Sequence, residues 1–257
     1  MRIIQTPRAG DFVEIEMREE KAVIVNIEKR INDLNRPPIA NIDQMIIVMS
    51  AVDPDFSVNL VDQMLIMANF HHIDVVLVVT KMDLIDAGHY VHDDINDYEK
   101  SGYKVVRSGK HYDTSEIEEL VANKFTVLSG QSGAGKSSLL NRINPNFDLR
   151  IQETSKALGR GKHTTRHVEF LPVAKGWVAD TPGFSKIDLT QLSKEELRDS
   201  MLEFQEPAQD CRFRDCYHIN EPGCAIRSGV EAGTIVLKRY ENYVKFYQDI
   251  DDTRKRY

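Results

Sequence analysis

Short apolar runs alternate with longer stretches of mixed polarity in the middle of the chain, and this alternation predicts a parallel β-sheet with crossover helices. Strands are predicted at residues 44–50, 73–80, 103–107, 125–129, 167–171 and 176–179. Helices are predicted at residues 58–70, 91–100, 115–124 and 136–143. In such domains the loops after the carboxyl ends of the strands line one edge of the sheet. Residues 37–188 are therefore expected to form one α/β domain.

The two ends of the chain follow different patterns. Apolar and polar residues alternate at residues 12–17 and 22–27, which predicts a small β-barrel over residues 1–36. Pro37 and Pro38 interrupt this pattern and are typical of a linker. After residue 188 the pattern becomes helical, with helices expected near residues 193–204 and 235–248. Three domains are thus expected, at residues 1–36, 37–188 and 189–257.

Composition narrows the class of protein. A chain of 257 residues with 41% hydrophobic residues can hold one nucleotide-binding domain of roughly 150 residues and smaller attachments. The net charge of -7 excludes a uniformly basic nucleic-acid-binding surface, so any RNA contact must be local. The apolar runs at residues 45–49 and 75–79 are far shorter than the roughly 20 residues that span a bilayer. We expect a soluble, cytoplasmic protein with no membrane segment and no secretory signal.

A glycine-rich loop follows the strand predicted at residues 125–129. Its residues are Gly130, Gln131, Ser132, Gly133, Ala134, Gly135, Lys136 and Ser137, with Ser138 next. In this spacing the glycines let backbone N–H groups face a β-phosphate, the lysine reaches the β and γ oxygens, and the Ser137 hydroxyl binds Mg²⁺. The alternative is an ordinary glycine turn before a helix, but the preceding strand and following helix favour a phosphate loop.

A second motif, Thr80-Lys81-Met82-Asp83, follows the strand predicted at residues 73–80. A carboxylate in the plane of a base accepts two hydrogen bonds from guanine N1–H and N2–H, which adenine lacks, so Asp83 is the candidate base reader. Lys81 would lie along the base, and Thr80 stands where the usual motif has asparagine. Ser108 is a weaker candidate, since its backbone N–H could meet the guanine carbonyl or simply belong to a turn.

The third motif, Asp180-Thr181-Pro182-Gly183, follows the last predicted strand. Asp180 is expected to be an outer-sphere ligand of Mg²⁺, and the Gly183 N–H is expected to donate a hydrogen bond to the γ-phosphate. We favour Thr165 over Thr164 as the threonine ligand of magnesium. Phe184 follows Gly183, where many GTPases have a glutamine that orients the attacking water, so His163 is the candidate for that role. Lys136, His163 and Thr165 are the catalytic candidates.

These motifs occur in an unusual order. An ordinary GTP-binding domain has the phosphate loop first and the base-reading loop last, whereas here the order is base, phosphate, magnesium. Because all three loops follow neighbouring parallel strands, a circular permutation moves the chain ends and leaves the site intact. The sequence therefore predicts a circularly permuted P-loop GTPase domain, with Mg²⁺ and GTP or GDP as its cofactor and ligands.

All three cysteines of the chain lie near one histidine, as Cys211, Cys216, His218 and Cys224. Three thiolates and one imidazole complete a closed tetrahedral Zn²⁺ site, which is structural because no coordination position remains open. The predicted helix that follows carries basic and aromatic residues that could meet RNA, although a solvated amphipathic helix is more common. They are Lys238, Arg239, Tyr240, Tyr243, Lys245 and Tyr247.

Taken together, these motifs closely resemble the bacterial ribosome small-subunit-dependent GTPase A (RsgA) family. The resemblance runs from about residue 10 to the C-terminus and includes the phosphate loop, residues 159–165, Asp180 to Phe184 and residues 211–224. It implies an N-terminal OB-fold, expected here as a shortened OB-like β-barrel, a permuted GTPase domain and a helical zinc-binding domain. It also implies late maturation of the small ribosomal subunit, contact with its 16S rRNA, and GTP hydrolysis that the subunit stimulates, by a protein expected to be a monomer.

Three other interpretations remain open. Phe184 would also suit an RNA-binding module with a nearly inert nucleotide pocket. A permuted GTPase that serves the large subunit is the second, although the cysteine and histidine cluster speaks against it. The third is a P-loop ATPase or small-molecule kinase, for which ATP should compete as well as GTP.

Overall fold

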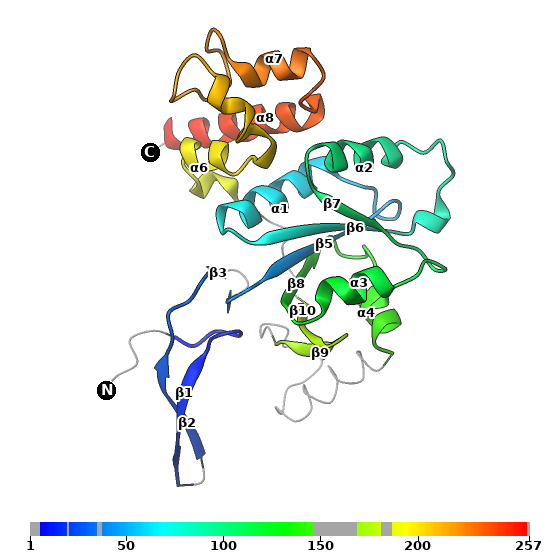
Figure 1. Ribbon diagram of the computed structural model, residues 1–257, viewed down its shortest axis with the longest axis vertical. Coiled ribbons are helices and arrows are strands. Elements are labelled where there is room, and N and C mark those ends of the chain that lie inside the picture. The colour runs from blue at the N-terminus through cyan, green and yellow to red at the C-terminus, as the bar shows by residue number, and fades with distance from the viewer. Residues whose placement is uncertain (1–5, 20, 35–37, 146–168, 181–186, 256–257) are drawn as a thin grey trace.

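The structure is a computed structural model that describes residues 6–19, 21–34, 38–145, 169–180 and 187–255. Its centre is a six-stranded sheet with the order β7-β6-β5-β8-β10-β9 (Figure 1). Five strands are parallel, and β9 runs antiparallel to β10. The strands are β5 (Gln44–Ser50), β6 (Asp74–Thr80), β7 (Lys104–Arg107), β8 (Phe125–Gly130), β9 (Leu171–Val173) and β10 (Gly176–Asp180). The prediction of an α/β domain around a parallel sheet is confirmed.

Helices cover both faces of this sheet. Among the described residues these helices are α1 (Val58–Phe70), α2 (Val91–Lys100), α3 (Ser115–Val121) and α4 (Lys136–Ile143). Side chains of β5 alternate between the faces: Ile47 packs in the cluster that includes α1 and α2, and Ile46 in the one that includes α3 and α4. All seven residues of β5 are buried, as expected for a strand covered on both sides.

Most predicted bounds in this domain agree with the structure to within a residue or two. Two predictions were less accurate. The helix expected at residues 115–124 ends at Val121, where Ala122 takes an extended ψ of 130°. The strand expected at residues 167–171 lies partly outside the described residues, and the observed β9 begins only at Leu171.

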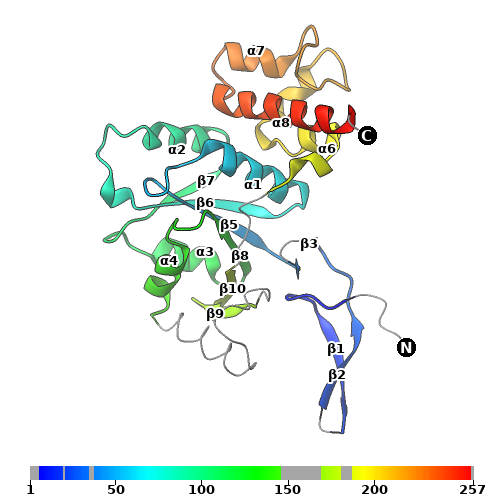
Figure 2. The same ribbon diagram turned by 180° about the vertical axis from the view of Figure 1, so that it is seen from behind.

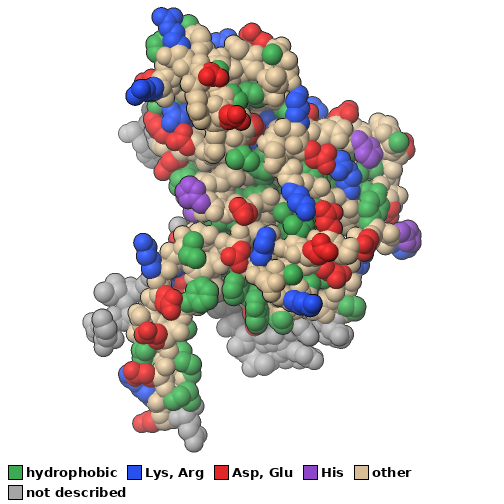
Figure 3. Space-filling model, in the orientation of Figure 1, with side chains coloured by type: hydrophobic (Ala, Val, Ile, Leu, Met, Phe, Trp, Pro, Cys, Tyr) green, Lys and Arg blue, Asp and Glu red, His purple; other side chains and the backbone are tan. Residues whose placement is uncertain are grey.

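The N-terminal part is a hairpin of β1 (Val13–Arg18) and β2 (Lys21–Ile27), followed by the short pair β3 (Asp33–Leu34) and β4 (Ile39–Ala40). Within the described ranges β1 and β2 pair only with each other, so the shortened OB-like β-barrel expected over residues 1–36 is seen there only as an open hairpin. A barrel requires that every edge strand find a partner. Instead, the apolar side chains of β1 lie on the surface of the hairpin (Figure 3), with Ile15 59% and Met17 68% exposed.

Residues 189–255 form a helical unit that packs beside α1 (Figures 1 and 2). Its elements are η2 (Leu189–Gln191), α6 (Lys194–Asp199), η3 (Leu202–Phe204), η4 (Pro207–Asp210), α7 (Ala225–Glu231) and α8 (Leu237–Lys255). It has its own apolar cluster, which Ile66 of α1 joins. No helix in the described ranges has an apolar stretch long enough to cross a membrane.

The helix expected at residues 193–204 was predicted too long. Ser193 caps α6 in a reciprocal capping box with Glu196, as its sequence suggests. The helix ends because Met201 takes an extended conformation, after the amide and the hydroxyl of Ser200 have both bonded to the Glu196 carbonyl. The short helix α7 was not predicted from the sequence.

Candidate functional site

The phosphate loop connects the end of β8 to the start of α4. Gly130 has a φ of 140°, and a Cβ there would lie 2.0 Å from the Val48 carbonyl oxygen, so only glycine fits. Gly133 and Gly135 have φ values of 81° and 88°, which glycine adopts without strain. The loop thus owes its shape to its glycines.

The side chains of this loop are arranged around its concave backbone. Lys136 Nζ donates hydrogen bonds to the carbonyls of Gly130 at 2.8 Å and Gln131 at 2.9 Å. Ala134 is buried, whereas the surface residues of the segment are Ser132, Gly133, Ser137 and Ser138. The lysine therefore bonds back onto the start of the loop, while Ser132, Gly133, Ser137 and Ser138 remain accessible to a ligand.

The base-reading motif lies directly against this loop. Thr80, at the end of β6, donates its hydroxyl to the Ala134 carbonyl at 2.6 Å. Lys81 has a left-handed φ of 58° and donates its Nζ to the Asp53 carbonyl. Asp83 follows in the one-turn η1 (Met82–Leu84) and is exposed. Motifs that are about fifty residues apart in the sequence therefore meet in one place.

The loop after β7 completes this side of the site. The Lys110 N–H donates to Asp83 Oδ1 at 2.9 Å, which fixes one carboxylate oxygen. Ser108 is buried, and its N–H donates to the Val79 carbonyl at 2.7 Å. The suggestion that this N–H meets the guanine carbonyl is therefore wrong for this geometry, because β6 already accepts that hydrogen bond.

The magnesium side is only partly described. Asp180 ends β10 beside Leu128 of β8, so the chain leaves the sheet next to the phosphate loop. Ser137 lies in the first turn of α4 and is exposed. The remaining candidates, His163, Thr164, Thr165 and Gly183, together with Phe184, lie outside the described residues.

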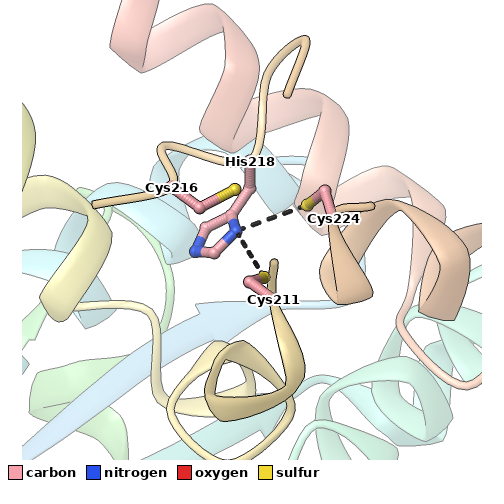
Figure 4. A group of neighbouring side chains, drawn as sticks. All are labelled: Cys211, Cys216, His218 and Cys224. Carbon is pink, nitrogen blue, oxygen red and sulfur yellow. Dashed lines mark hydrogen bonds between the residues drawn. The ribbon is translucent and has the colours of Figure 1, made fainter. Parts of the chain in front are cut away.

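The cysteine and histidine cluster is assembled between η4 and α7 (Figure 4). The ligand atoms of Cys211, Cys216, His218 and Cys224 lie within 4.8 Å of one another. His218 Nδ1 is 3.6 Å from Cys211 Sγ and 3.4 Å from Cys224 Sγ. Zinc bond lengths of about 2.3 Å to sulfur and about 2.0 Å to nitrogen, at a tetrahedral angle, place S and N roughly 3.6 Å apart. The cluster therefore fits one zinc ion.

Burial shifts the pKa values of two of these ligands, Cys216 and His218. It raises the pKa of the Cys216 thiol to about 12 and lowers the pKa of His218 to about 4. At neutral pH the imidazole is thus already in its neutral, ligating form, whereas the thiol needs a cation beside it to become a thiolate. Zinc binding should accordingly release protons.

We expect removal of zinc to unfold the C-terminal unit, because its small apolar cluster includes Cys216 and Cys224 themselves. A zinc-selective chelator in excess Mg²⁺ should lower the helical circular dichroism and open residues 189–255 to proteases. The affinity for fluorescent GDP should change by less than about threefold, since the nucleotide loops belong to the other unit. Restored zinc should reverse the effect, and simultaneous loss of GDP binding would contradict independent units.

Three arginine and aspartate roles were not foreseen from the sequence. Arg142 of α4 bonds to the loop after β7, and the carbonyl of Asp53 accepts from Lys81. Arg239 of α8, expected among possible RNA contacts, is 1% exposed, and Tyr243 is fully buried, so neither can meet RNA. Only the spacing of the apolar residues along α8 could have indicated that these two side chains are buried, because no sequence motif marks a buried arginine.

Comparison with known proteins identifies the family. The RsgA GTPase family model matches residues 27–190. The small ribosomal subunit biogenesis GTPase RsgA of Shouchella clausii is 45% identical over 258 residues, covering 98% of this chain and 88% of the relative. The protein of the same name from Bacillus subtilis is 43% identical, with 98% and 87% covered.

Solved structures agree with this assignment. The crystal structure of YloQ, described as a circularly permuted GTPase, matches with a TM-score of 0.82 at 37% identity, over 97% of this chain and 83% of its own. YjeQ from Thermotoga maritima matches with a TM-score of 0.82 at 34% identity, over 95% and 84%. The chain therefore belongs to the RsgA GTPase family and is a circularly permuted GTP hydrolase, for which the family implies Mg²⁺ with the nucleotide.

Proposed function

We propose that this chain binds the small ribosomal subunit in its GTP-bound form during late maturation and hydrolyses GTP to GDP and phosphate there. Hydrolysis then permits release. The relatives named small ribosomal subunit biogenesis GTPase support the biological role. The observation that supports the chemistry is the 2.6 Å hydrogen bond from Thr80 to Ala134, because the proposal requires the base-reading and phosphate loops to lie side by side.

The protein groups have distinct roles in this proposal. Asp83 accepts hydrogen bonds from guanine N1–H and N2–H, with Lys81 along the base. Lys136 and the loop amides, from Gly130 to Ser138, hold the phosphates. Ser137 and Thr165 would bind Mg²⁺ directly, and Asp180 would act as its outer-sphere ligand.

The attack of water needs a further group. Phe184 has no hydrogen-bonding atom in its side chain, so it cannot orient water as a glutamine would. We assign this role to His163 and the γ-phosphate contact to the Gly183 N–H. Slow turnover without the subunit follows, because the side chain at position 184 cannot orient the attacking water.

We further propose that the protein contacts the 16S rRNA of the subunit as a monomer in the cytoplasm. The net charge of -7 favours contacts through local patches rather than through a broad basic surface. The zinc-bound unit would then act as a rigid attachment to the GTPase domain, held by the packing of α1 against α8.

Turnover assays with purified subunits test this proposal. GTP hydrolysis at saturating Mg²⁺ should rise by at least about tenfold on addition of small subunits, equivalent to about 1.4 kcal/mol of activation free energy. Large subunits and ATP serve as controls and should give no increase. Equal stimulation by large subunits would favour the large-subunit alternative, and no turnover under any condition would favour an inert nucleotide pocket.

A further inference from the structure

We propose that Arg142 is a positioning residue for guanine recognition. It holds the loop at residues 108–112 beside Asp83 and ties this loop to the helix that begins at the phosphate loop. The inference rests on the proposed function in one respect, namely that Asp83 reads guanine. None of the motifs that carry the resemblance to the RsgA family includes this position.

The contacts of Arg142 carry the proposal. The residue lies in the last turn of α4, and its Nη1 donates to the Gly109 carbonyl at 2.7 Å. The same nitrogen lies 3.4 Å from Ser108 Oγ, and Nη2 donates to the Tyr112 carbonyl. The planar guanidinium thus spans the loop and bonds to two backbone carbonyls through two separate nitrogens, which the single ammonium nitrogen of a lysine could not do.

This loop in turn supports Asp83. The Lys110 N–H donates to Asp83 Oδ1 at 2.9 Å. A Cβ on Gly109 would lie 2.4 Å from the same oxygen, so the loop backbone packs directly against the carboxylate. A shift of the loop would therefore move or release the group that reads the base.

The side chain of Thr80 does not tie the loop after β7 to the phosphate loop. An asparagine amide offers two N–H donors and an acceptor, whereas a threonine hydroxyl has one donor. In this chain that donor goes to the Ala134 carbonyl of the phosphate loop. The side chain of Thr80 therefore has no second donor for the loop after β7, and Arg142 supplies a tie from α4.

The arrangement predicts which kinetic constants depend on Arg142. The base contacts do not change during phosphoryl transfer, so a loss of their positioning should weaken ground-state and transition-state binding equally. Such a loss raises KM and leaves kcat nearly unchanged. A residue that only stabilised the fold would lower the melting temperature without this selectivity.

The test compares nucleotide binding in Arg142→Met, Arg142→Lys and the wild-type chain. We expect the Kd for GDP and GTP to rise about tenfold in Arg142→Met and by less in Arg142→Lys, which can bond to one carbonyl. The Kd for ADP, which lacks the contacts to Asp83, should stay within twofold. Subunit-stimulated turnover should show the rise in KM with kcat within about twofold.

A matched control is available in the same region. Arg107 immediately precedes the loop, but its guanidinium pairs with Glu99 at 2.7 Å and contributes nothing to the carbonyls of Gly109 and Tyr112. Arg107→Met removes the same charge and should leave GDP binding unchanged. Arg142→Lys keeps the inference testable if Arg142→Met does not fold.

Two outcomes overturn the inference while leaving the proposed function intact. One is a GDP affinity in Arg142→Met within twofold of the wild type. The other is an equal loss for GDP and ADP, which would place the effect on the phosphate loop. Failure of the wild-type chain to prefer GDP over ADP would instead refute the assignment of Asp83.

Discussion

Replacement of Asp83 with asparagine is expected to reverse the base preference from guanine to xanthine nucleotides. Asp83 Oδ1 accepts from the Lys110 N–H, and an asparagine Oδ1 can keep this bond. The same oxygen can still accept from N1–H, which guanine and xanthine share, whereas the amide nitrogen repels the N2–H of guanine and donates to the 2-oxygen of xanthine. A lost hydrogen bond to a charged group costs about 1.5–3 kcal/mol, so GTP affinity should fall by about 10- to 150-fold.

Competition of GTP, XTP and ATP for a fluorescent nucleotide measures this change. Asp86→Asn is the matched control, since Asp86 lies in the same loop but accepts a hydrogen bond from the Gly88 N–H at 3.0 Å. It should leave all three affinities unchanged. An unaltered GTP affinity in Asp83→Asn would show that this carboxylate does not read the base.

Among the substitutions proposed, replacement of Arg239 with methionine is expected to lower the free energy of unfolding the most. Arg239 pairs with Asp62 of α1 and Glu203 of η3, and the exposed fractions of the three side chains are 1%, 1% and 9%. Its guanidinium also lies 5.1 Å from the ring centres of Tyr98 and Tyr103. Although burial opposes the charge, the two carboxylates hold the pKa of Arg239 well above its usual range.

Arg239→Met would leave two buried carboxylates without their cation. Breaking a buried pair in this way costs about 3–5 kcal/mol. Because Arg239 belongs to α8 and Asp62 to α1, the loss should weaken the attachment of the C-terminal unit to the GTPase domain. Denaturant unfolding followed by circular dichroism measures the change in free energy.

A surface ion pair provides the control for this prediction. Lys104 pairs with Glu116 at 3.1 Å, and the two side chains are 49% and 54% exposed. Lys104→Met should therefore change the free energy of unfolding by at most about 1 kcal/mol. Equal effects of the two substitutions would mean that the buried arginine contributes no more than a surface ion pair.

Residues close together in the chain allowed much of the fold and site to be predicted. The strand at Gln44–Ser50 and the helix at Val58–Phe70 were found at their observed bounds, because an unbroken apolar run and a capped periodic segment are local signals. The phosphate loop and the cysteine cluster were also readable, since their ligand-binding groups lie within 8 and 14 residues of sequence. Chemistry at short spacing leaves a pattern that sequence alone displays.

Contacts between distant residues were decided only by the tertiary structure. Nothing near Arg142 shows that it bonds to a loop 33 residues earlier, and nothing near Arg239 shows that Asp62 lies against it, 177 residues away. The open hairpin likewise depended on which strands find partners, because alternating polarity is the same in a closed barrel and in a free hairpin. Local preference determines which elements form, whereas burial of a particular charge or carbonyl depends on how those elements pack.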